Sequence, residues 1–360
     1  MSTDIDYSRL KDDLIIEYAK KRLIIEKKAA ASNLSEVQRS MSLQMMKSIY
    51  THLNCLESYE NANSLDKALD AIDLAKIYES VDRREQEKTN TKLNYDDFVV
   101  LELLRYFKHD FFKWVNSPSC PCGSTDVSTV GVKRPDSANN PDQISIIEIH
   151  QCQKCHHQIE FPRINNPVSL LRTRTGRCGE WVNCFLLILT ALIGEGKDRI
   201  RYVWNNEDHV WCEYYSSGLR RWVHLDPCEG VFDETLLYCD NWGKRMSYVI
   251  GFNKNSVVDL SKKYITKDKQ IDQSSVADPS KVEKVITYYN VKKADDYLTQ
   301  SKSIYSERES WKALYTDVFV PRNLERGELR TEEEATVSSD LPKGRQTGSV
   351  EWTKARGEDG

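Results

Sequence analysis

The segment "RTRTGRCGEWVNCFLLILTALIGEG", residues 172–196, joins a polar, glycine-containing stretch directly to an apolar run. The run predicts a buried helix, and Cys178 falls at its expected first turn, whereas Cys184 lies inside it. Backbone N–H groups and the helix dipole favour negative charge at a helix N-terminus, so a thiolate would be stabilised there. Cys178 is therefore a candidate nucleophile. The alternative is that it is one of several unreactive thiols among the 10 cysteines of the chain.

The composition is that of an ordinary globular protein. The chain has 360 residues, 39% hydrophobic and 29% charged, with a net charge of −4 and a pI of about 6.1. No basic surface is indicated, so we expect no nucleic-acid partner. The longest apolar segment, 182–193, is far shorter than a membrane span, and the acidic N-terminus lacks the apolar region of a secretory signal. We therefore expect no membrane insertion and reduced cysteines.

Residue periodicity predicts helices at both ends of the chain and strands near its middle. Residues 5–80 read as helical, with Leu10, Leu14 and Tyr18 forming one stripe, and residues 281–320 read as helical again. The charged stretch 82–94 predicts an exposed loop, and Asp96 is expected to cap the helix that follows.

From residue 199 the chain alternates between apolar and polar residues as strands do. "IRYVW", "HVWCEYY" and "RWVHLD" are separated by "NNED" and "SSGLR" turns. Helices followed by antiparallel strands indicate an α+β fold. We expect an N-terminal helical region over 1–94, a core over 95–270 that includes a cysteine-rich segment at 117–162, a C-terminal helical extension over 271–322 and a disordered tail over 323–360.

Two close cysteine pairs in the segment 117–162 indicate a metal site. Cys152 and Cys155 form a C-x-x-C, and Cys120 and Cys122 form a tighter C-x-C. Four thiolates suit a closed, structural Zn²⁺ site, which would replace the core that this loop-rich segment lacks. The C-x-C is the less regular pair, so a histidine could substitute for one of its sulfurs; the candidates are His150, His156 and His157. Four unrelated thiols are the alternative.

A thiol nucleophile needs a base and a group that orients the base. If the strands around "SSGLR" form a hairpin, His209 and Asp226 meet at the same end, and Asp226 would fix the imidazole tautomer. His224 shares the strand face of Asp226 and is the second-choice base. The alternative is a histidine at a strand end and an aspartate that only forms a turn before Pro227.

The ordered motifs "GRCGEWVN", "NNEDHVWCEYY", "RWVHLDPCE" and "NWGKRMSYVIGF" closely resemble those of the cytoplasmic peptide:N-glycanases, in their short fungal form. The resemblance runs from about Asp96 to Ile265, and the final "GSVEWTKARGEDG" is also similar. It implies a transglutaminase-like, papain-type core with a zinc-binding insertion and flanking helices. Cys178 would be the nucleophile, His209 the base and Asp226 its orienter, with zinc bound by Cys120, Cys122, Cys152 and Cys155. The family usually has C-x-x-C at the first pair.

The reaction that the resemblance implies is hydrolysis of the bond between an Asn side chain and the first GlcNAc of an N-linked glycan. A thioester would form and water would release Asp, while His209 protonates the departing glycosylamine. Flat rings and acceptors near the triad are candidates for binding the sugar, with core packing as the alternative for the rings; these residues are Trp211, Glu213, Trp222, Glu229 and Trp242.

Other readings of the same residues remain open. A cysteine protease or a transglutaminase would use the same triad, and a zinc scaffold without activity would use none of it. By resemblance, the substrates are misfolded high-mannose glycoproteins of ER-associated degradation. The terminal helices would bind a proteasome-linked ubiquitin receptor. The expected location is the cytoplasm, with the nucleus as a second compartment.

Overall fold

The computed structural model describes residues 6–53, 55–87, 92–136, 138–193, 197–325, 329–330 and 341–360. Contacts divide the chain into two units. Unit 1 consists of Met1–Cys55 and Met246–Arg330, and unit 2 consists of Leu56–Arg245 and Thr331–Gly360. These boundaries differ from the expected ones because segments far apart in sequence pack together within each unit.

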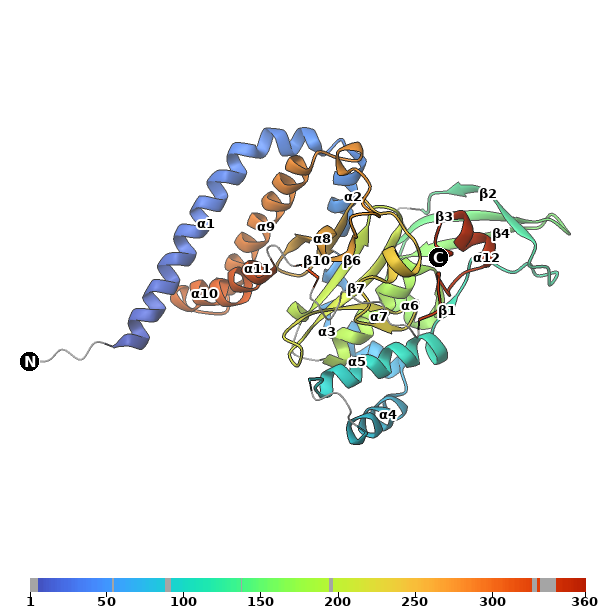
Figure 1. Cartoon of the computed structure of the whole chain (residues 1–360), viewed down its shortest axis with the longest axis horizontal. Helices are drawn as coiled ribbons and strands as arrows, with labels where there is room; N and C mark the ends of the chain where they lie inside the picture. The colour runs from blue at the N-terminus through green and yellow to red at the C-terminus, as the bar shows by residue number, and fades with distance from the viewer. Residues whose placement is uncertain are drawn as a thin grey trace, which may run out of the picture. The chain divides into compact units, whose positions relative to one another are not determined.

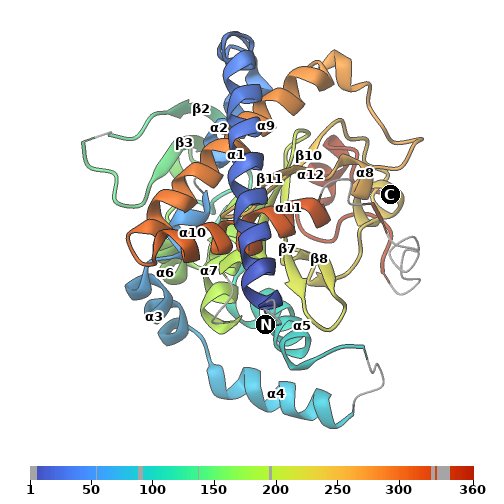
Figure 2. The same ribbon diagram turned by 90° about the vertical axis from the view of Figure 1, so that its left-hand side faces the viewer.

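Unit 1 is mostly helical. Its elements are α1 (Tyr7–Ser40), α2 (Gln44–His52), β10 (Val249–Phe252), β11 (Val257–Asp259), α8 (Ser261–Tyr264), η5 (Gln273–Ser275), α9 (Pro279–Lys302), α10 (Glu307–Ala313), η6 (Leu314–Phe319) and α11 (Val320–Glu325). Helices α1 and α9 run side by side in Figure 1 and pack against each other, and α9 crosses behind α1 in Figure 2. Their shared core contains Ala19, Leu23, Ala294 and Leu298, and η6 adds Phe319.

The stripe predicted on α1 is helical, but it lies on the solvent side. Leu10, Leu14 and Tyr18 are 48%, 64% and 48% exposed, whereas Ile16 and Leu23 are buried. The apolar residues of α1 therefore form two faces, and only one of them packs against α9. None of the helices in the described ranges combines the length and the apolar character that crossing a membrane requires.

Unit 2 combines helices with three sets of strands. Its helical elements are α3 (Ala62–Ala71), α4 (Leu74–Gln86), α5 (Tyr95–Tyr106), η2 (Phe107–Phe111), α6 (Pro167–Thr173), α7 (Cys178–Ile193), η3 (Lys197–Arg199), η4 (Leu237–Asn241) and α12 (Val350–Ala355), while η1 (Cys55–Tyr59) crosses the unit boundary. Its strands are β1 (Lys113–Trp114), β2 (Val127–Lys133), β3 (Ile144–Cys152), β4 (Gln158–Ile164), β5 (Thr175–Gly176), β6 (Ile200–Asn205), β7 (His209–Ser216), β8 (Arg221–Asp226) and β9 (Val231–Phe232).

The strands of unit 2 pair mainly with their neighbours in sequence. Strands β6 to β9 form an antiparallel meander, β2 to β4 form a separate antiparallel sheet, and β1 pairs in parallel with β5. Helix α7 packs against β6 and β7 (Figure 1). The apolar run of α7 is fully buried from Cys184 to Leu189, and Phe107 meets the rings of Trp181 and Phe185 edge-on. A buried helix therefore holds Cys178 at the edge of this core.

Three local predictions are wrong. Helix α4 includes residues 82–86 of the expected loop; residues 88–91 lie outside the described residues. Helix α5 is capped by Asn94 and not by Asp96, because Asn94 and Asp97 bond each other's backbone N–H in a capping box. The tail expected to be disordered is folded over 341–360 and contains α12, while residues 326–328 and 331–340 lie outside the described part.

Candidate active site

Cys178 begins helix α7 and is half-buried. The turn before it is tight, because a Cβ on Gly176 would lie 2.4 Å from Cβ of Glu180. The Glu180 carboxylate folds back to accept the N–H of Arg177 at 3.1 Å and pairs with Arg163 at 2.7 Å. An acidic group that accepts a free N–H of the first turn stabilises a helix start. The glycine and the glutamate of "GRCGE" thus fix where the thiol lies.

His209 begins β7, and Asp226 ends β8. The β7–β8 register is that of the predicted hairpin, with Cys212 opposite Leu225, and it brings the two side chains together. Nε2 of His209 lies 3.0 Å from Oδ2 of Asp226, and both side chains are fully buried. Among the described residues, no other group bonds Nδ1 of His209, which leaves that nitrogen for the Cys178 thiol.

The three groups change one another's charge state. Burial raises the pKa of the Cys178 thiol, but the hydrogen bond and charge of His209 outweigh burial and hold the pKa below its ordinary value. Burial lowers the pKa of His209, and the bonds with Asp226 and Cys178 more than reverse this. Burial also raises the pKa of Asp226, yet His209 brings it well below the usual range. The arrangement favours a thiolate beside an imidazolium.

Groups other than His209 also hold Asp226 in place. Its Oδ1 accepts the N–H of Cys228 at 2.8 Å and of Glu229 at 3.3 Å, and its Oδ2 accepts the hydroxyl of Tyr238 at 3.0 Å. A carboxylate with this many donors has one fixed orientation, which in turn orients the imidazole.

His224, the second-choice base, lies behind Asp226. Its Nδ1 accepts the N–H of Glu234 at 3.2 Å, and its Nε2 lies 2.8 Å from the hydroxyl of Tyr238. An accepting Nδ1 places the proton on Nε2, so His224 donates to Tyr238, and Tyr238 donates to Asp226. His224 supports the aspartate, and its ring nitrogens are already engaged.

The residues expected to bind sugar are all buried. The ring of Trp211 stacks on Tyr238 at 4.2 Å between centroids, and the ring of Trp242 lies 5.2 Å from that of His209. Glu213 pairs with Arg201 at 2.6 Å, and the Arg201 guanidinium lies 3.7 Å from the centre of the Trp222 ring.

Glu229 accepts two backbone N–H groups of the C-terminal tail, both at 3.1 Å. Trp211 and Trp242 thus form the surroundings of His209, while both glutamates are occupied by partners within the chain.

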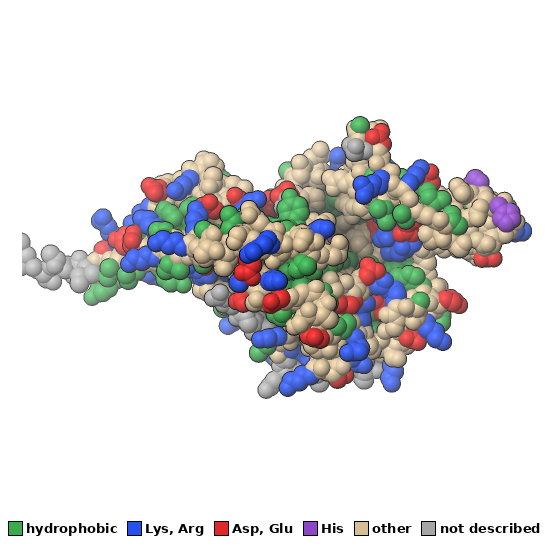
Figure 3. All heavy atoms as spheres, turned by 90° about the horizontal axis from the view of Figure 1, so that it is seen from above, with side chains coloured by type: hydrophobic (Ala, Val, Ile, Leu, Met, Phe, Trp, Pro, Cys, Tyr) green, Lys and Arg blue, Asp and Glu red, His purple; other side chains and the backbone are tan. Residues whose placement is uncertain are grey.

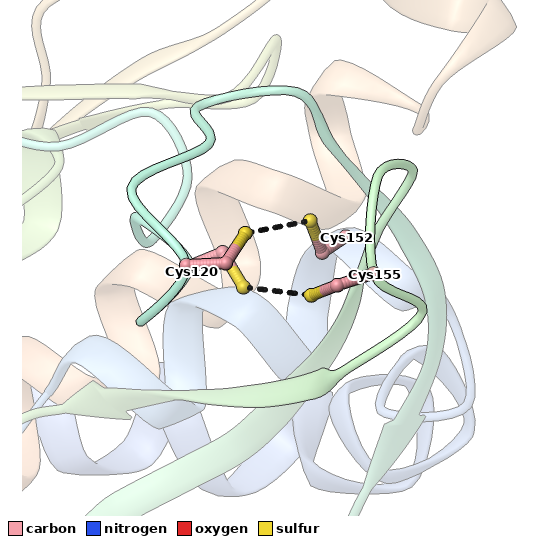
Figure 4. Close-up of side chains that lie close together, drawn as sticks. Cys120, Cys152 and Cys155 are labelled. Carbon is pink, nitrogen blue, oxygen red and sulfur yellow. Dashed lines mark hydrogen bonds between the residues drawn. The ribbon is translucent and has the colours of Figure 1, made fainter.

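The four predicted metal ligands form one cluster. Their sulfur atoms all lie within 4.8 Å of one another, with Cys120 and Cys155 at 3.4 Å and Cys122 and Cys152 at 3.7 Å. Figure 4 shows the sulfurs of Cys120, Cys152 and Cys155 pointing toward one another. Thiolates bound tetrahedrally at about 2.3 Å from Zn²⁺ lie roughly 3.8 Å apart, which fits these distances.

Cys122 lies inside the cluster, so no histidine is needed to complete the four ligands. His150 is turned away, because its Nε2 bonds Glu148 at 3.2 Å and its Nδ1 lies 3.4 Å from Thr129. His156 and His157 are exposed, and neither belongs to the group of close ligand atoms found among the described residues.

Comparison with known proteins identifies the family. Residues 132–227 match the profile of the Transglutaminase-like superfamily, and residues 195–313 match that of the Rad4 transglutaminase-like domain. A curated protein of Candida albicans, named peptide-N(4)-(N-acetyl-beta-glucosaminyl)asparagine amidase, is 50% identical over 100% of this chain and 97% of its own length. This chain belongs to the peptide-N(4)-(N-acetyl-beta-glucosaminyl)asparagine amidase family.

Two further amidases of that name support the assignment. The protein of Debaryomyces hansenii is 47% identical over 99% of this chain and 97% of its own length. That of Candida glabrata is 40% identical over 84% of this chain and 83% of its own length. The resemblance to peptide:N-glycanases and the α+β, transglutaminase-like fold class are therefore confirmed.

Sequence reasoning missed several residues of this amidase site. Tyr238 was hidden in an apolar run, and its hydroxyl reaches Asp226 from η4, outside the β7–β8 hairpin. Glu180 gave a signal, since a carboxylate in the first turn of a helix favours its start, but its partner Arg163 lies on β4. Arg345 could not be placed beside the site, because its neighbours there are distant in sequence.

Proposed function

We propose that this chain hydrolyses the amide bond between an Asn side chain and the first GlcNAc of an N-linked glycan, which converts Asn to Asp. The observation that carries the proposal is the 3.0 Å hydrogen bond from His209 to a fixed Asp226, with Cys178 as the partner of the same imidazole. Membership of the amidase family supports the choice of substrate.

The reaction follows from the three groups. The Cys178 thiolate attacks the side-chain carbonyl carbon and forms a C–S bond, and the backbone N–H of Cys178 at the start of α7 donates to the resulting oxyanion. As the C–N bond breaks, His209 gives its proton to the nitrogen of the glycosylamine. His209 then takes a proton from water, which attacks the thioester, releases Asp and restores the thiol. Asp226 keeps the imidazole in one orientation throughout.

The rings of Trp211 and Trp242 lie against His209 and are fully buried. We propose that they contact the first sugar only after the groups that cover them move, with Trp222 further along the sheet. Glu213 and Glu229 would act on the sugar only by exchanging a partner within the chain, since each carboxylate is already bonded.

A denatured high-mannose glycoprotein provides the test. Incubation with the chain should release the glycan and leave Asp at the former glycosylation site, seen as a mass increase of about 1 Da over Asn after glycan loss, while casein stays intact. Cleavage of casein, or transfer of an amine to glutamine without glycan release, would favour a protease or a transglutaminase and overturn the proposal.

We further propose that the four-cysteine cluster holds one structural Zn²⁺. The S–S distances of 3.4 and 3.7 Å and the all-thiolate ligand set suit zinc, and a closed four-ligand site leaves no position for chemistry. Zinc would join the C-x-C loop to the turn between β3 and β4.

The exposed stripe of α1 supports a partner at the terminal helices. Leu10, Leu14 and Tyr18 are exposed on α1, and unit 1 also exposes Ile304 and Tyr305, by 73% and 52%, between α9 and α10. Figure 3 shows hydrophobic side chains at the surface of this helical unit, among charged groups. We propose that a proteasome-linked ubiquitin receptor binds here, and that misfolded glycoproteins reach the enzyme through it.

We place this activity in the cytoplasm, with the nucleus as a second compartment. A reducing compartment suits a thiolate nucleophile and four metal-binding thiols, and all the described cysteines are free thiols. Fractionation of cells that produce the tagged chain would check the location.

A further inference from the structure

The end of the chain is folded onto unit 2 beside the candidate triad. The N–H of Gly344 donates to the carbonyl of Asn241 at 3.0 Å, the amide of Asn241 donates to the carbonyl of Pro342 at 2.7 Å, and the N–H of Gly360 donates to the carbonyl of Trp242 at 3.3 Å. Both ends of the segment 342–360 are therefore attached to the loop that carries Trp242.

The same segment binds the loop that follows Asp226. The Glu229 carboxylate accepts the N–H of Gln346 and of Thr347, both at 3.1 Å, and the hydroxyl of Thr347 at 2.7 Å. The backbone N–H of Glu229 donates to Asp226. Glu229 therefore connects the C-terminal segment to the carboxylate that orients His209.

The segment 342–360 also binds the turn before His209. Arg356 pairs with the carboxylate of Asp208 at 2.5 Å and bonds its carbonyl oxygen. The tail is specifically shaped for these contacts: Gly348 has φ +106°, and a Cβ there would lie 2.8 Å from the ring of Trp352. Three loops that position the base and its orienter are thus held by one segment.

Arg345 and Glu358 are the buried charged side chains of this segment. The guanidinium of Arg345 has several contacts. Its Nη1 pairs with Glu358 at 2.8 Å and its Nε donates to Thr347 at 3.1 Å, while Nη2 is buried and has no hydrogen-bond partner among the described residues. The guanidinium carbon lies 4.7 Å from the ring centre of Trp114 and 5.0 Å from that of Trp242.

These two rings connect Arg345 to the triad from both sides. Trp242 lies against His209, with 5.2 Å between the ring centroids. Trp114 lies on β1, opposite Gly176 of β5, which is two residues before Cys178. The guanidinium is therefore fixed between the strand that leads to the nucleophile and the ring that covers the base.

We propose that the C-terminal segment 342–360 completes the active site, and that Arg345 is a positioning residue that brings a fixed positive charge to Cys178 and His209. The inference rests on the proposed role of Cys178 as the nucleophile. Loss of the segment 342–360 would loosen the loops of His209 and Asp226 together, and it would remove the Arg345 cation that favours the thiolate.

The charges around Arg345 agree with this role. Burial lowers the pKa of Arg345, but the charges of Cys178 and Glu358 raise it above its usual value, so it stays charged. Burial raises the pKa of Glu358, and Arg345 and Lys244 lower it to about 2. Glu229 also faces Arg345, at 3.9 Å, and Arg345 in turn lowers the pKa of both Cys178 and His209.

The test is the rate at which iodoacetamide alkylates Cys178, measured by mass spectrometry across pH. Arg345→Met should move the midpoint of this pH profile upward by about one unit, and Arg345→Lys should keep it closer to that of the parent. Arg172→Met is the matched control, since it removes one arginine charge from a side chain that is 76% exposed. A midpoint in Arg345→Met equal to that of Arg172→Met would overturn the proposal.

A second variant of the full chain covers the case in which Arg345→Met does not fold. Arg345→Gln removes the charge but keeps a polar end that can bond Glu358 or Thr347, and it should move the alkylation midpoint in the same direction. A midpoint in a folded Arg345→Gln equal to that of Arg172→Met would overturn the proposal. Because alkylation needs no glycan, these results are separate from any failure to release glycan.

Discussion

The two cysteines of α7 are a matched pair within one helix. The pKa of Cys178 is lowered by His209 despite burial, whereas burial raises the pKa of Cys184 far above its usual value. A group with a lowered pKa is ionised at lower pH, so alkylation of Cys178 should rise with pH around a midpoint below about 8.5. Cys184 should stay unmodified, and Cys178→Ala should abolish glycan release in a folded protein. Faster labelling of Cys184 would show that the thiolate is misassigned.

The two histidines of the β7–β8 hairpin, His209 and His224, differ in what they contact. His209→Ala should lower the rate of glycan release by about 10²- to 10⁴-fold, because the proton donor is lost. Asp226→Asn should have an effect of similar size, on the order of 10⁴-fold, since an amide can hold the wrong tautomer. His224→Ala should be milder, because His224 acts only through Tyr238.

Rates of these variants should be measured beside circular dichroism spectra. The His209→Ala, Asp226→Ala double variant should be scarcely slower than either single one if the residues act as a unit. An inactive His224→Ala beside an active His209→Ala would instead make His224 the base.

The structure brings together the three residues proposed as a triad, and each stands at the end of an element that the sequence marks. Cys178 precedes an apolar run, and His209 and Asp226 lie at the same end of two alternating strands joined by a turn. Tyr238 and Arg345 were not predictable in this way. Their contribution comes from contacts across the fold, which leave no local pattern around either residue.

At the scale of elements, the start of α7 depends on the absence of a side chain at Gly176. Gly176→Ala would place a methyl group 2.4 Å from Cβ of Glu180, so the helix start must shift. We expect a loss of roughly 1–3 kcal/mol in unfolding free energy and slower alkylation of Cys178. Gly179→Ala is the control in the same turn, since a Cβ there meets nothing within 4 Å. Urea unfolding of both variants checks the prediction, and equal stability would contradict it.

The sheet β2–β4 links the four-cysteine cluster to the turn before Cys178. Glu148 of β3 pairs with Arg177 at 2.8 Å and with Arg163 of β4 at 3.2 Å, and Arg163 pairs with Glu180. If the cluster holds the proposed zinc, loss of the ion should first lower the unfolding temperature and only then the rate of glycan release, because the ion would support the fold.

Metal analysis of the purified chain and calorimetry with a chelator test this order. Cys122→Ser should lose zinc as fully as Cys120→Ser, since both sulfurs lie in the cluster. Retention of the metal in Cys122→Ser alone would mean that another ligand takes its place.

Helices and strands were predicted correctly where a local periodic pattern marks them. The prediction failed where contacts with residues distant in sequence determine whether a segment folds. Strands β6, β7 and β8 match the three alternating segments. The segment 341–360 is polar and charged, and by composition it cannot form a core of its own. It folds because partners such as Glu229 and Trp242 already exist in unit 2.

At the scale of the whole molecule, unit 1 is assembled from two segments, Met1–Cys55 and Met246–Arg330, which flank the first segment of unit 2 in the sequence. Glu36 pairs with Lys284 at 2.7 Å, and Lys312 pairs with Asp12 at 2.6 Å, so its core closes only when residues some 250 to 300 positions apart meet. Its stability should therefore depend on the inner face of α1, while its outer face remains available for a partner.

The same leucine-to-alanine substitution at two positions of α1 tests the core-packing role of its inner face and the partner-binding role of its outer face separately. Leu23 is 3% exposed in the core with α9, and Leu14 is 64% exposed. Leu23→Ala should lower the unfolding free energy by about 2–5 kcal/mol, whereas Leu14→Ala should change it by less than about 0.5 kcal/mol. If the outer stripe binds the ubiquitin receptor, Leu14→Ala should weaken that binding without slowing glycan release from a free glycoprotein. Urea unfolding, titration calorimetry with the receptor and the release assay give the three readings. Equal destabilisation by both variants would show that the stripe is part of the core after all.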